Sequence, residues 1–249
     1  MKKYELTAEF IEKWGKKLFR IKALISFGSV EAGELGGYVE KEDNLAQNGN
    51  AWVCGDARVF GDARVFGNAR VCGDARVCGN ARVCGNARVC GNAEVFGNAR
   101  VCGNAWVCDD AEVCGNAWVC GDARVCGNAR VFGNARVCGN AEVCGDARVC
   151  GNARVCGNAW VFGNADYLLI GRIGSRFSFT TFFKNKDKGI TVSCGCFLGT
   201  IAEFRAKVTD THGNNKHAKM YNLAADMAEL QILGEEHFDK LNTNKSEPF

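Results

Sequence analysis

Proline, histidine and long apolar runs are all scarce in this chain. Its 249 residues include one proline, Pro248, close to the C-terminus. No apolar run approaches the ~18 residues of a membrane-spanning helix, which excludes such a helix and argues against a membrane partner. Three histidines leave few candidates for general-base or zinc chemistry. The net charge of +3 is too small to predict a nucleic-acid partner by itself.

The N-terminal stretch also lacks the apolar segment of a secretion signal. Met1-Lys2-Lys3-Tyr4-Glu5 is charged, and no apolar segment follows it. We therefore expect a cytoplasmic protein. Its 16 cysteines would then meet a reducing compartment and remain thiols.

What the chain has in abundance is a six-residue repeat. From residue 51 to 164 the unit Ala-x-Val-Cys/Phe-Gly-Asn/Asp occurs 19 times without insertion or deletion. In an extended segment, Ala and Val point to one side, and the residues that follow each of them point to the other. Gly followed by Asn or Asp forms a turn, because these residues tolerate a left-handed backbone. A period of six leaves no 3.6-residue stripe, which excludes a helix.

Three such units, one for each side, would close a triangular coil. Stacked coils pair as parallel strands about 4.8 Å apart, with Val and Ala in the interior. We predict a mainly β solenoid over residues 51–165. A small β cap with an imperfect first coil should precede it over 1–50, with Leu45 and Gln47 in interior positions. An α+β module over 166–240 and a tail over 241–249 should follow.

The unit resembles the hexapeptide repeat of left-handed parallel β-helix proteins. That repeat has an aliphatic residue, two variable positions, a left-handed Asn or Asp and a small residue, and 83–88 (Val-Cys-Gly-Asn-Ala-Arg) fits it. The flanks at 18–24, 33–40 and 195–200 resemble the end modules of a bacterial and phage hexapeptide-repeat group labelled as transferases by similarity. The resemblance implies left-handed coils and no established activity. One unit departs from the pattern, with Asp109 in place of the corner Gly.

The two end modules have their own patterns. Alternating residues on either side of Trp14-Gly15 predict a hairpin that turns there. After the repeat, strands are expected over 167–170, 176–183 and 190–197, and helices over 201–209 and 216–233. The second helix should carry one apolar face made of Met220, Leu223, Ala224, Met227, Leu230 and Leu233.

Every eighteenth residue should share an outward column, which gives the solenoid three faces. Face 1 carries Trp52, Arg70, Arg88, Trp106, Arg124, Glu142 and Trp160. Face 2 carries Arg58, Arg76, Glu94, Glu112, Arg130 and Arg148. Face 3 carries Arg64, Arg82, Arg100, Trp118, Arg136 and Arg154, with no carboxylate. Since Arg and Trp are enriched at interface hot spots, face 3 is our candidate surface for a protein partner or for self-association. A groove for nucleic acid or another polyanion is an alternative.

Catalytic and metal-binding functions have little support in the repeat. Hexapeptide acyltransferases use a histidine base on a loop, but the repeat contains no histidine and no inserted loop. His212, His217 and His237 all lie in the C-terminal module. The sequence therefore identifies no catalytic residue, metal ligand or cofactor site, and a diverged acyltransferase remains an alternative.

The repeat cysteines form columns too, and these columns have two interpretations. A line of thiolates does not suit tetrahedral zinc, although a soft ion such as Cu(I) could bridge two of them. In the other interpretation, Cys is a small apolar residue that stacks well. We favour the second interpretation and predict a non-enzymatic solenoid that serves as a scaffold or binding protein.

Overall fold

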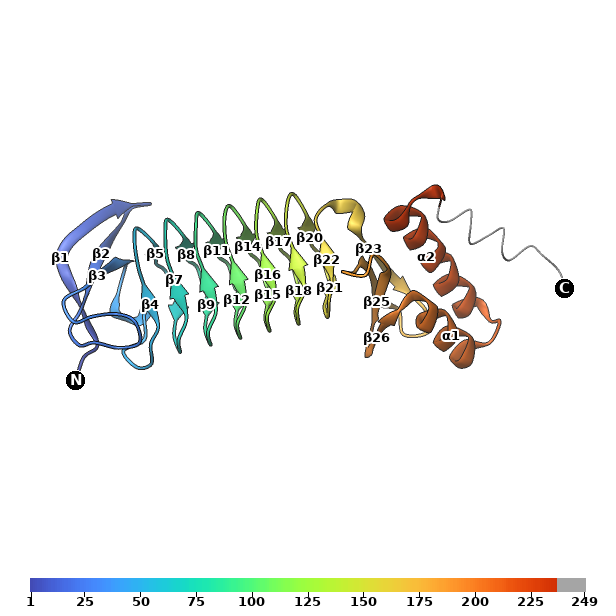
Figure 1. Cartoon of the computed structure of the whole chain (residues 1–249), viewed down its shortest axis with the longest axis horizontal. Helices are drawn as coiled ribbons and strands as arrows, with labels where there is room; N and C mark the ends of the chain where they lie inside the picture. Colours follow the sequence, from blue (N-terminus) through green and yellow to red (C-terminus); the bar gives the residue numbers. More distant parts are fainter. Residues whose placement is uncertain (237–249) are drawn as a thin grey trace.

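Three parallel sheets wind around one long apolar core in the computed structural model, which describes residues 1–236 (Figure 1). A β cap closes the N-terminal end of the solenoid, and a module of four strands and two helices follows its other end. The expected tail at 241–249, the last residues of the expected C-terminal module, and His237 lie outside the described residues.

Each six-residue unit contributes one two-residue strand, and the strands sort into the three expected faces. Face 1 consists of β4 (Trp52–Val53), β7 (Arg70–Val71), β10 (Arg88–Val89), β13 (Trp106–Val107), β16 (Arg124–Val125), β19 (Glu142–Val143) and β22 (Trp160–Val161). Face 2 consists of β5 (Arg58–Val59), β8 (Arg76–Val77), β11 (Glu94–Val95), β14 (Glu112–Val113), β17 (Arg130–Val131) and β20 (Arg148–Val149). Face 3 consists of β6 (Arg64–Val65), β9 (Arg82–Val83), β12 (Arg100–Val101), β15 (Trp118–Val119), β18 (Arg136–Val137) and β21 (Arg154–Val155).

The strands of neighbouring coils pair in parallel, and every pair has the same register. Arg100 lies beside Trp118 and Val101 beside Val119, and the same shift holds along every face. Backbone N–H groups donate from one coil to the next, as from Trp118 to the Ala135 carbonyl at 2.9 Å. The predicted solenoid, with a coil made of three units, is confirmed.

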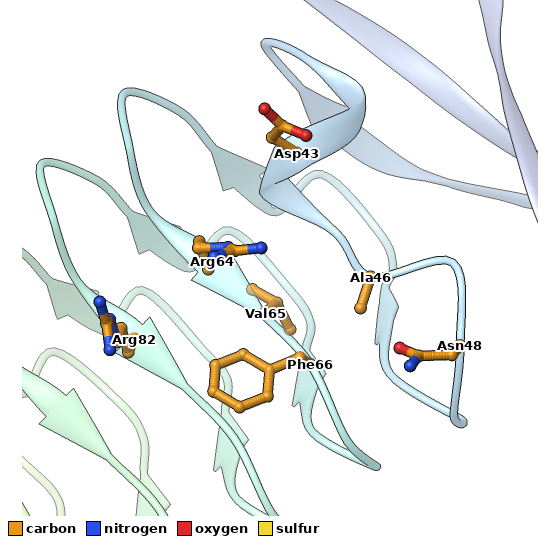
Figure 2. Close-up of a pocket in the computed structure, with 7 residues that line it drawn as sticks. All are labelled: Asp43, Ala46, Asn48, Arg64, Val65, Phe66 and Arg82. Carbon is orange, nitrogen blue, oxygen red and sulfur yellow. The ribbon is translucent and has the colours of Figure 1, made fainter.

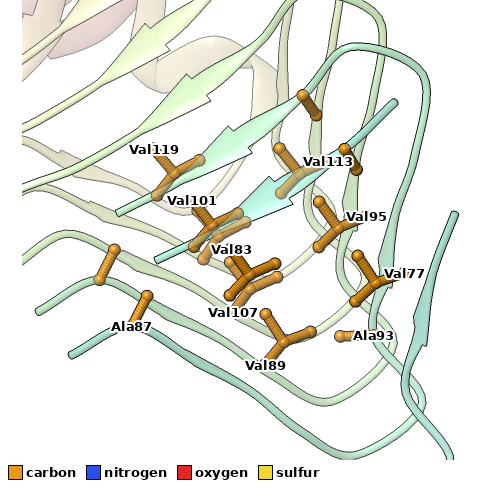
Figure 3. Close-up of a cluster of buried hydrophobic side chains, with 14 of the residues drawn as sticks. Val77, Val83, Ala87, Val89, Ala93, Val95, Val101, Val107, Val113 and Val119 are labelled. Carbon is orange, nitrogen blue, oxygen red and sulfur yellow. The ribbon is translucent and has the colours of Figure 1, made fainter. Parts of the chain in front are cut away.

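The Ala and Val side chains of the units fill the interior, and every one of them is 0% exposed, which confirms the inward assignments. Trp52 of face 1 is an exception among the expected outward residues, because its ring is 2% exposed against Tyr4 and Phe27 of the cap. Figure 3 shows the valines of successive coils stacked in columns with alanines beside them. Because each coil buries its small apolar set against the coils on both sides, the core is continuous along the rod.

The corners depend on the left-handed backbone that glycine supplies. Gly103 has φ of 72°, and a Cβ placed on it would lie 2.9 Å from the Gly121 nitrogen of the next coil. Asp109 adopts the same conformation with φ of 60°. Its carboxylate accepts a hydrogen bond from the Gly127 N–H at 3.0 Å, which offsets part of the cost of a side chain there.

The N-terminal cap extends the sheet of face 2. Strands β1 (Tyr4–Lys13) and β2 (Lys16–Ala23) form an antiparallel hairpin. As predicted, its turn is at Trp14 and Gly15. Both residues have positive φ. Strand β3 (Leu35–Val39) then joins β2 to β5 and makes one nine-stranded sheet.

The first coil is irregular, and only one of its two expected interior residues is buried. After the short 3₁₀ helix η1 (Glu42–Asn44), Leu45 is buried and bridges to Val65. Gln47 is half-buried instead, and its side-chain oxygen accepts the Lys3 backbone N–H at 2.8 Å. The polar Gln47 side chain therefore forms a hydrogen bond with the backbone of the cap and does not pack into the apolar core.

The C-terminal module begins with the 3₁₀ helix η2 (Asn164–Asp166). A four-stranded antiparallel sheet follows: β23 (Tyr167–Ile173), β24 (Ser178–Lys184), β25 (Ile190–Cys194) and β26 (Phe197–Thr200). The single strand expected over 190–197 is wrong. Gly195 adopts φ of 60° and turns the chain back, so that β25 and β26 form a hairpin.

Two helices complete this module. Helix α1 (Ile201–His212) begins with a capping box between Thr200 and Glu203. It runs past the expected end at Thr209 to His212, and Gly213 is its C-cap. Helix α2 (Lys216–Leu233) has the expected bounds, with Asn215 as its N-cap. No helix within residues 1–236 is long and apolar enough to cross a membrane.

The predicted apolar face of α2 is not its buried face. The buried residues are Ala218, Tyr221, Ala224, Ala225, Ala228, Glu229 and Ile232, whereas Met220, Leu223, Met227 and Leu230 are exposed. Helix α2 packs on α1 and the sheet through small alanines, which allow close approach. The larger apolar side chains therefore point outward, and of the six expected residues only Ala224 is buried.

Candidate functional site

Face 3 carries the six candidate binding residues in one column, one in each coil. Strand pairing places Arg64, Arg82 and Arg100 in register on one side of Trp118, with Arg136 and Arg154 on the other side. Their backbone N–H groups from Arg64 to Arg136 donate to Ala carbonyls of the next coil at 2.9 Å. The column is therefore fixed to a sheet whose inner surface is fully packed.

Among residues 1–236, the arginines of face 3 have no carboxylate partners, whereas most arginines of face 2 do. On face 2, Arg58, Arg76 and Arg130 pair with Asp74, Glu94 and Glu112 respectively. In the described part of the chain, none of the five face-3 arginines forms an ion pair; Arg154 instead donates to the Gly195 carbonyl at 3.0 Å. Unpaired guanidinium groups on a flat sheet are available to an external acceptor.

The corners reinforce this difference between the faces. Four aspartates (Asp56, Asp74, Asp110 and Asp146) and Asp109 lie at the corners between faces 1 and 2. The corners that border face 3 contain only Asp62 and Asp122. Lys41 already pairs with Asp62 at 2.8 Å. Face 3 is thus the least compensated positive surface of the solenoid.

Trp118 is held from three sides. The guanidinium carbons of Arg100 and Arg136 lie 6.0 and 5.3 Å from its ring centroid, within the range of cation–π contacts. Its indole N–H donates to the Cys102 Sγ at 3.0 Å. The ring is half-buried as a result, so it forms a rigid centre for the arginine rows.

The same arrangement recurs on face 1, where the Trp106 N–H donates to the Cys90 Sγ at 3.0 Å and Arg124 covers the ring. Sequence reasoning missed both contacts. The available signal was the spacing, because each Trp follows a cysteine of the preceding coil on its own face by the same interval.

A hollow of about 270 Å³ lies at the N-terminal end of face 3 (Figure 2). Its lining consists of Asp43, Ala46, Asn48, Arg64, Val65, Phe66 and Arg82. The hollow exists because the irregular first coil contributes only the Leu45 bridge to this face. In Figure 2 the Arg64 side chain points into the gap and the Phe66 ring lies beside Val65. Apart from the loss of period before residue 51, no signal in the sequence points to this hollow.

The cysteine columns differ from expectation. Disulfides link Cys54 to Cys72, Cys126 to Cys144, and Cys138 to Cys156 across neighbouring coils. The prediction that all cysteines remain thiols is therefore wrong for these six. The stacking itself explains the pairing, because the Cα atoms of each pair are only 4.6–4.7 Å apart, within disulfide range.

Ten cysteines are free thiols, and their surroundings differ. Burial and the neighbouring Asp109 carboxylate raise the pKa of Cys108 to about 12. Burial and the Glu112 carboxylate, which accepts from the thiol, raise the pKa of Cys114 to about 11. Both thiols are protonated and unreactive near neutral pH, because the thiolate is the nucleophile.

The two described histidines lie in the C-terminal module and not on face 3. His212 and His217 face each other where α1 meets α2, with ring centroids 5.9 Å apart. Within residues 1–236, no group of three or more His, Cys, Asp or Glu side chains is arranged to hold a metal ion. Cys194 accepts from the Thr180 hydroxyl at 3.2 Å, and Cys196 is exposed on the following turn.

Comparison with known proteins bears on the repeat. A family model described as the YdcK beta solenoid repeat matches residues 57–73, 63–79, 75–91, 123–139 and 147–163, each close to one coil in length. These matches all lie within the solenoid and together cover less than half of the chain. No curated protein matches the chain. Over these coils the chain carries the beta-solenoid repeat that the YdcK family model describes.

Proposed function

We propose that this chain is a non-enzymatic scaffold or binding protein whose face 3 binds a protein partner. The observation that carries the proposal is the contrast in charge pairing between faces 2 and 3. Three arginines of face 2 are neutralised by carboxylates of the solenoid itself. Within residues 1–236, the arginines of face 3 have no such partner, and two of them, Arg100 and Arg136, flank Trp118.

The partner that fits this surface carries carboxylates on a flat or extended region. Arginine presents a planar fork of donors that matches a carboxylate. Neighbouring forks on face 3 are one coil apart, except across Trp118, where Arg100 and Arg136 are two coils apart. Trp118 adds apolar area at the centre of the patch with little side-chain entropy to lose. The rigid backbone beneath means that binding orders only side chains.

We also propose that the coils are left-handed and belong to the hexapeptide-repeat class, as in the bacterial and phage group that the flanking segments resemble. The order of residues within the unit supports this, with Val, two variable positions, Asn or Asp, and Ala. An experimental structure tests the handedness directly.

A cytoplasmic location is part of the same proposal. The ten free thiols support a reducing compartment, and the three disulfides oppose it. Blocking thiols with N-ethylmaleimide at lysis and then counting the modified cysteines tests this. Sixteen modified cysteines in the cytoplasmic fraction would support the location, and recovery of the protein outside that fraction would exclude it.

The binding test uses two matched triple variants. The first combines Trp118→Ala with Arg100→Glu and Arg136→Glu on face 3. The control combines Trp106→Ala on face 1 with Arg76→Glu and Arg130→Glu on face 2, so that it has the same substitutions and the same net charge. Circular dichroism establishes that both variants keep the β-rich fold.

The probes are a fluorescent peptide rich in Glu and Tyr and a single-stranded oligonucleotide of similar charge. We expect the acidic peptide to bind the wild type and the control, and to lose measurable affinity for the face-3 variant. Equal loss in both variants would show that the binding surface is not face 3. Preference for the oligonucleotide, with an affinity that falls steeply as salt rises, would replace the protein partner by a polyanion.

A further inference from the structure

Face 3 contains a second column that the proposed function does not use. Five consecutive coils each place one cysteine on it, at Cys84, Cys102, Cys120, Cys138 and Cys156. From Cys84 to Cys138, each cysteine N–H donates to the Val carbonyl of the following coil at 2.9–3.0 Å. The backbone positions of the five cysteines are therefore held at equal steps along the axis of the rod.

Two redox states of cysteine meet within this column. Cys138 and Cys156 at the C-terminal end form a disulfide, with Cα atoms 4.6 Å apart. Cys84, Cys102 and Cys120 are free, and the Cys102 thiol lies within hydrogen-bonding reach of both others. Cys120 thus occupies the position directly before an existing disulfide, one coil away.

We propose that this column, which we call the thiol ladder, carries out thiol–disulfide exchange along the solenoid. The Cys138–Cys156 disulfide would move one coil at a time toward the N-terminal end, through Cys120–Cys138 and Cys102–Cys120 to Cys84–Cys102.

Each step is balanced without an added oxidant or reductant. The Cys120 thiolate attacks the Cys138 Sγ, an S–S bond forms between them, and the Cys138–Cys156 bond breaks. The electron pair leaves on the Cys156 Sγ, which takes up the proton that Cys120 released. The strand register stacks Cys120, Cys138 and Cys156 in one column, so the attacking thiol starts one coil away from the bond that breaks.

The residues around the thiol ladder have opposing effects on the ionisation of the attacking thiols. Arg136 lies beside Cys120, Arg82 and Arg100 lie beside Cys84, and these cations favour the thiolate. The Trp118 N–H donates to the Cys102 Sγ at 3.0 Å. Burial acts in the opposite direction and raises the pKa of Cys84 and Cys120. Exchange should therefore be slow at neutral pH and faster as the thiols ionise.

The other two faces lack a ladder of this kind. On face 2, Cys78, Cys114 and Cys150 alternate with phenylalanines, so no cysteine has a cysteine neighbour. Face 1 has an unbroken row of cysteines, but Cys108 in its middle lies beside the Asp109 carboxylate. Among the described residues, face 3 alone combines an unbroken row with cationic neighbours and no adjacent carboxylate.

The ladder would connect a shielded disulfide to an accessible one. Cys156 is 8% exposed beneath the C-terminal module, whereas Cys84 is half-buried at the other end of the column, two residues after Arg82, which lines the hollow. Migration by three coils covers roughly 14 Å. The external reactant that this suits is a small thiol or a protein dithiol, which could then reduce the disulfide at the N-terminal end.

Disulfide mapping tests the proposal on the full-length protein. The protein is incubated near the ordinary thiol pKa of about 8.5, then quenched with acid and alkylated with N-ethylmaleimide. Tryptic cleavage separates 101–124, 137–148 and 155–172, so a shifted disulfide links the first two peptides and leaves Cys156 alkylated. We expect both signals to grow with incubation time in the wild type.

Two serine variants distinguish migration from general opening of the fold. Cys120→Ser removes the attacking thiol and should abolish alkylation of Cys156. Cys114→Ser removes a face-2 thiol with no cysteine neighbour, and Cys156 should be alkylated as in the wild type. If the isolated protein contains only thiols, oxidised glutathione is added first to form the starting disulfide.

Three outcomes would overturn the proposal. The first is that Cys156 stays unmodified in the wild type while a urea-unfolded sample exchanges freely. The second is equal alkylation of Cys156 in the Cys120→Ser variant and the wild type. The third is failure of excess oxidised glutathione to form any disulfide within the ladder.

Discussion

Faces 2 and 3 have the same backbone and the same interior, yet their outward columns differ. On face 2, Glu94 and Glu112 neutralise arginines of adjacent coils, and large and small residues alternate in the column that follows. On face 3, arginines gather around Trp118 beside an unbroken row of cysteines. Because the inward Ala and Val and the corner glycines determine the coil, the outward positions are free to specialise.

The largest effect should come from the interior, and it should be the same on both faces. Val95→Asp on face 2 and Val101→Asp on face 3 each bury a carboxylate with no partner, since both valines are 0% exposed. We expect losses on the order of 3–5 kcal/mol in the free energy of unfolding. Urea titration measures this. Arg100→Gln is the control, and its effect should stay under about 1 kcal/mol. A larger effect from Arg100 than from Val101 would reverse the inside and outside of the coil.

Corner substitutions should give an intermediate effect. Gly97 and Gly103 have φ of 70° and 72°, and an added Cβ would lie 3.0 and 2.9 Å from backbone nitrogen in the next coil. Replacement of either by Ala should cost about 1–2 kcal/mol, because an L residue is strained in this region.

Asp109→Gly provides the matched control for the corners. Relief of the left-handed strain should offset loss of the hydrogen bond to Gly127, so the thermal midpoint should change little. A midpoint that falls as far as in Gly103→Ala would mean that the Asp109 hydrogen bond matters more than the backbone conformation.

Thiol reactivity sharpens the difference between the faces. Glu112 helps to raise the pKa of Cys114 to about 11, so Glu112→Gln should lower that pKa while burial keeps it above its ordinary value. The pH dependence of alkylation of Cys114 measures the shift. An unchanged pKa would leave burial as the whole cause.

The same pKa has a consequence for stability. The folded protein holds the Cys114 proton more tightly than the unfolded chain does. The contribution of this thiol is therefore fully present below its ordinary pKa and is lost as the pH rises toward about 11. Cys114→Ser should flatten the pH dependence of the urea midpoint in this window.

The smallest effects should come from the surface charges, and they should differ in sign. Glu112→Gln removes the partner of Arg130 on face 2 and should cost about 0.5 kcal/mol. Arg82→Gln removes a charge from a row of like charges on face 3 and should be neutral or slightly stabilising at low salt. Added salt should reduce both effects, and equal destabilisation by the two changes would contradict the contrast between the faces.

The repeat could be predicted almost completely from the sequence, because its signals are local. Alternation of Ala51 and Val53, the glycine corners and the turn at Trp14-Gly15 each follow from the conformations that those residues allow. The six residues of face 3 follow from counting three units at a time, which the strand register confirms.

The features that we predicted wrongly or did not predict depend on tertiary contacts. The repeat period and the structural preferences of single residues carry no information about these contacts. The buried face of α2 is made of alanines because close helix packing prevailed over side-chain size, and the outward position of Met227 could not be read from its type. The Gly195 turn lies in the middle of a stretch whose residue types predict one continuous strand. Prediction of the ion pairs of face 2 and of the hollow beside Arg64 requires the distances between side chains. The order of residues in each column does not give these distances.

Because every coil pairs with the next in the same register, the length of the solenoid can change only in steps of one coil. Loss or gain of three consecutive units changes its length by one coil, about 4.8 Å, and returns every later residue to its original face. Loss of a single unit turns everything beyond it by a third of a revolution, so Arg136 would leave the column of Trp118. A change in length that keeps every residue on its original face must therefore insert or delete whole coils. In the gene, this means the coding sequence of three units at a time.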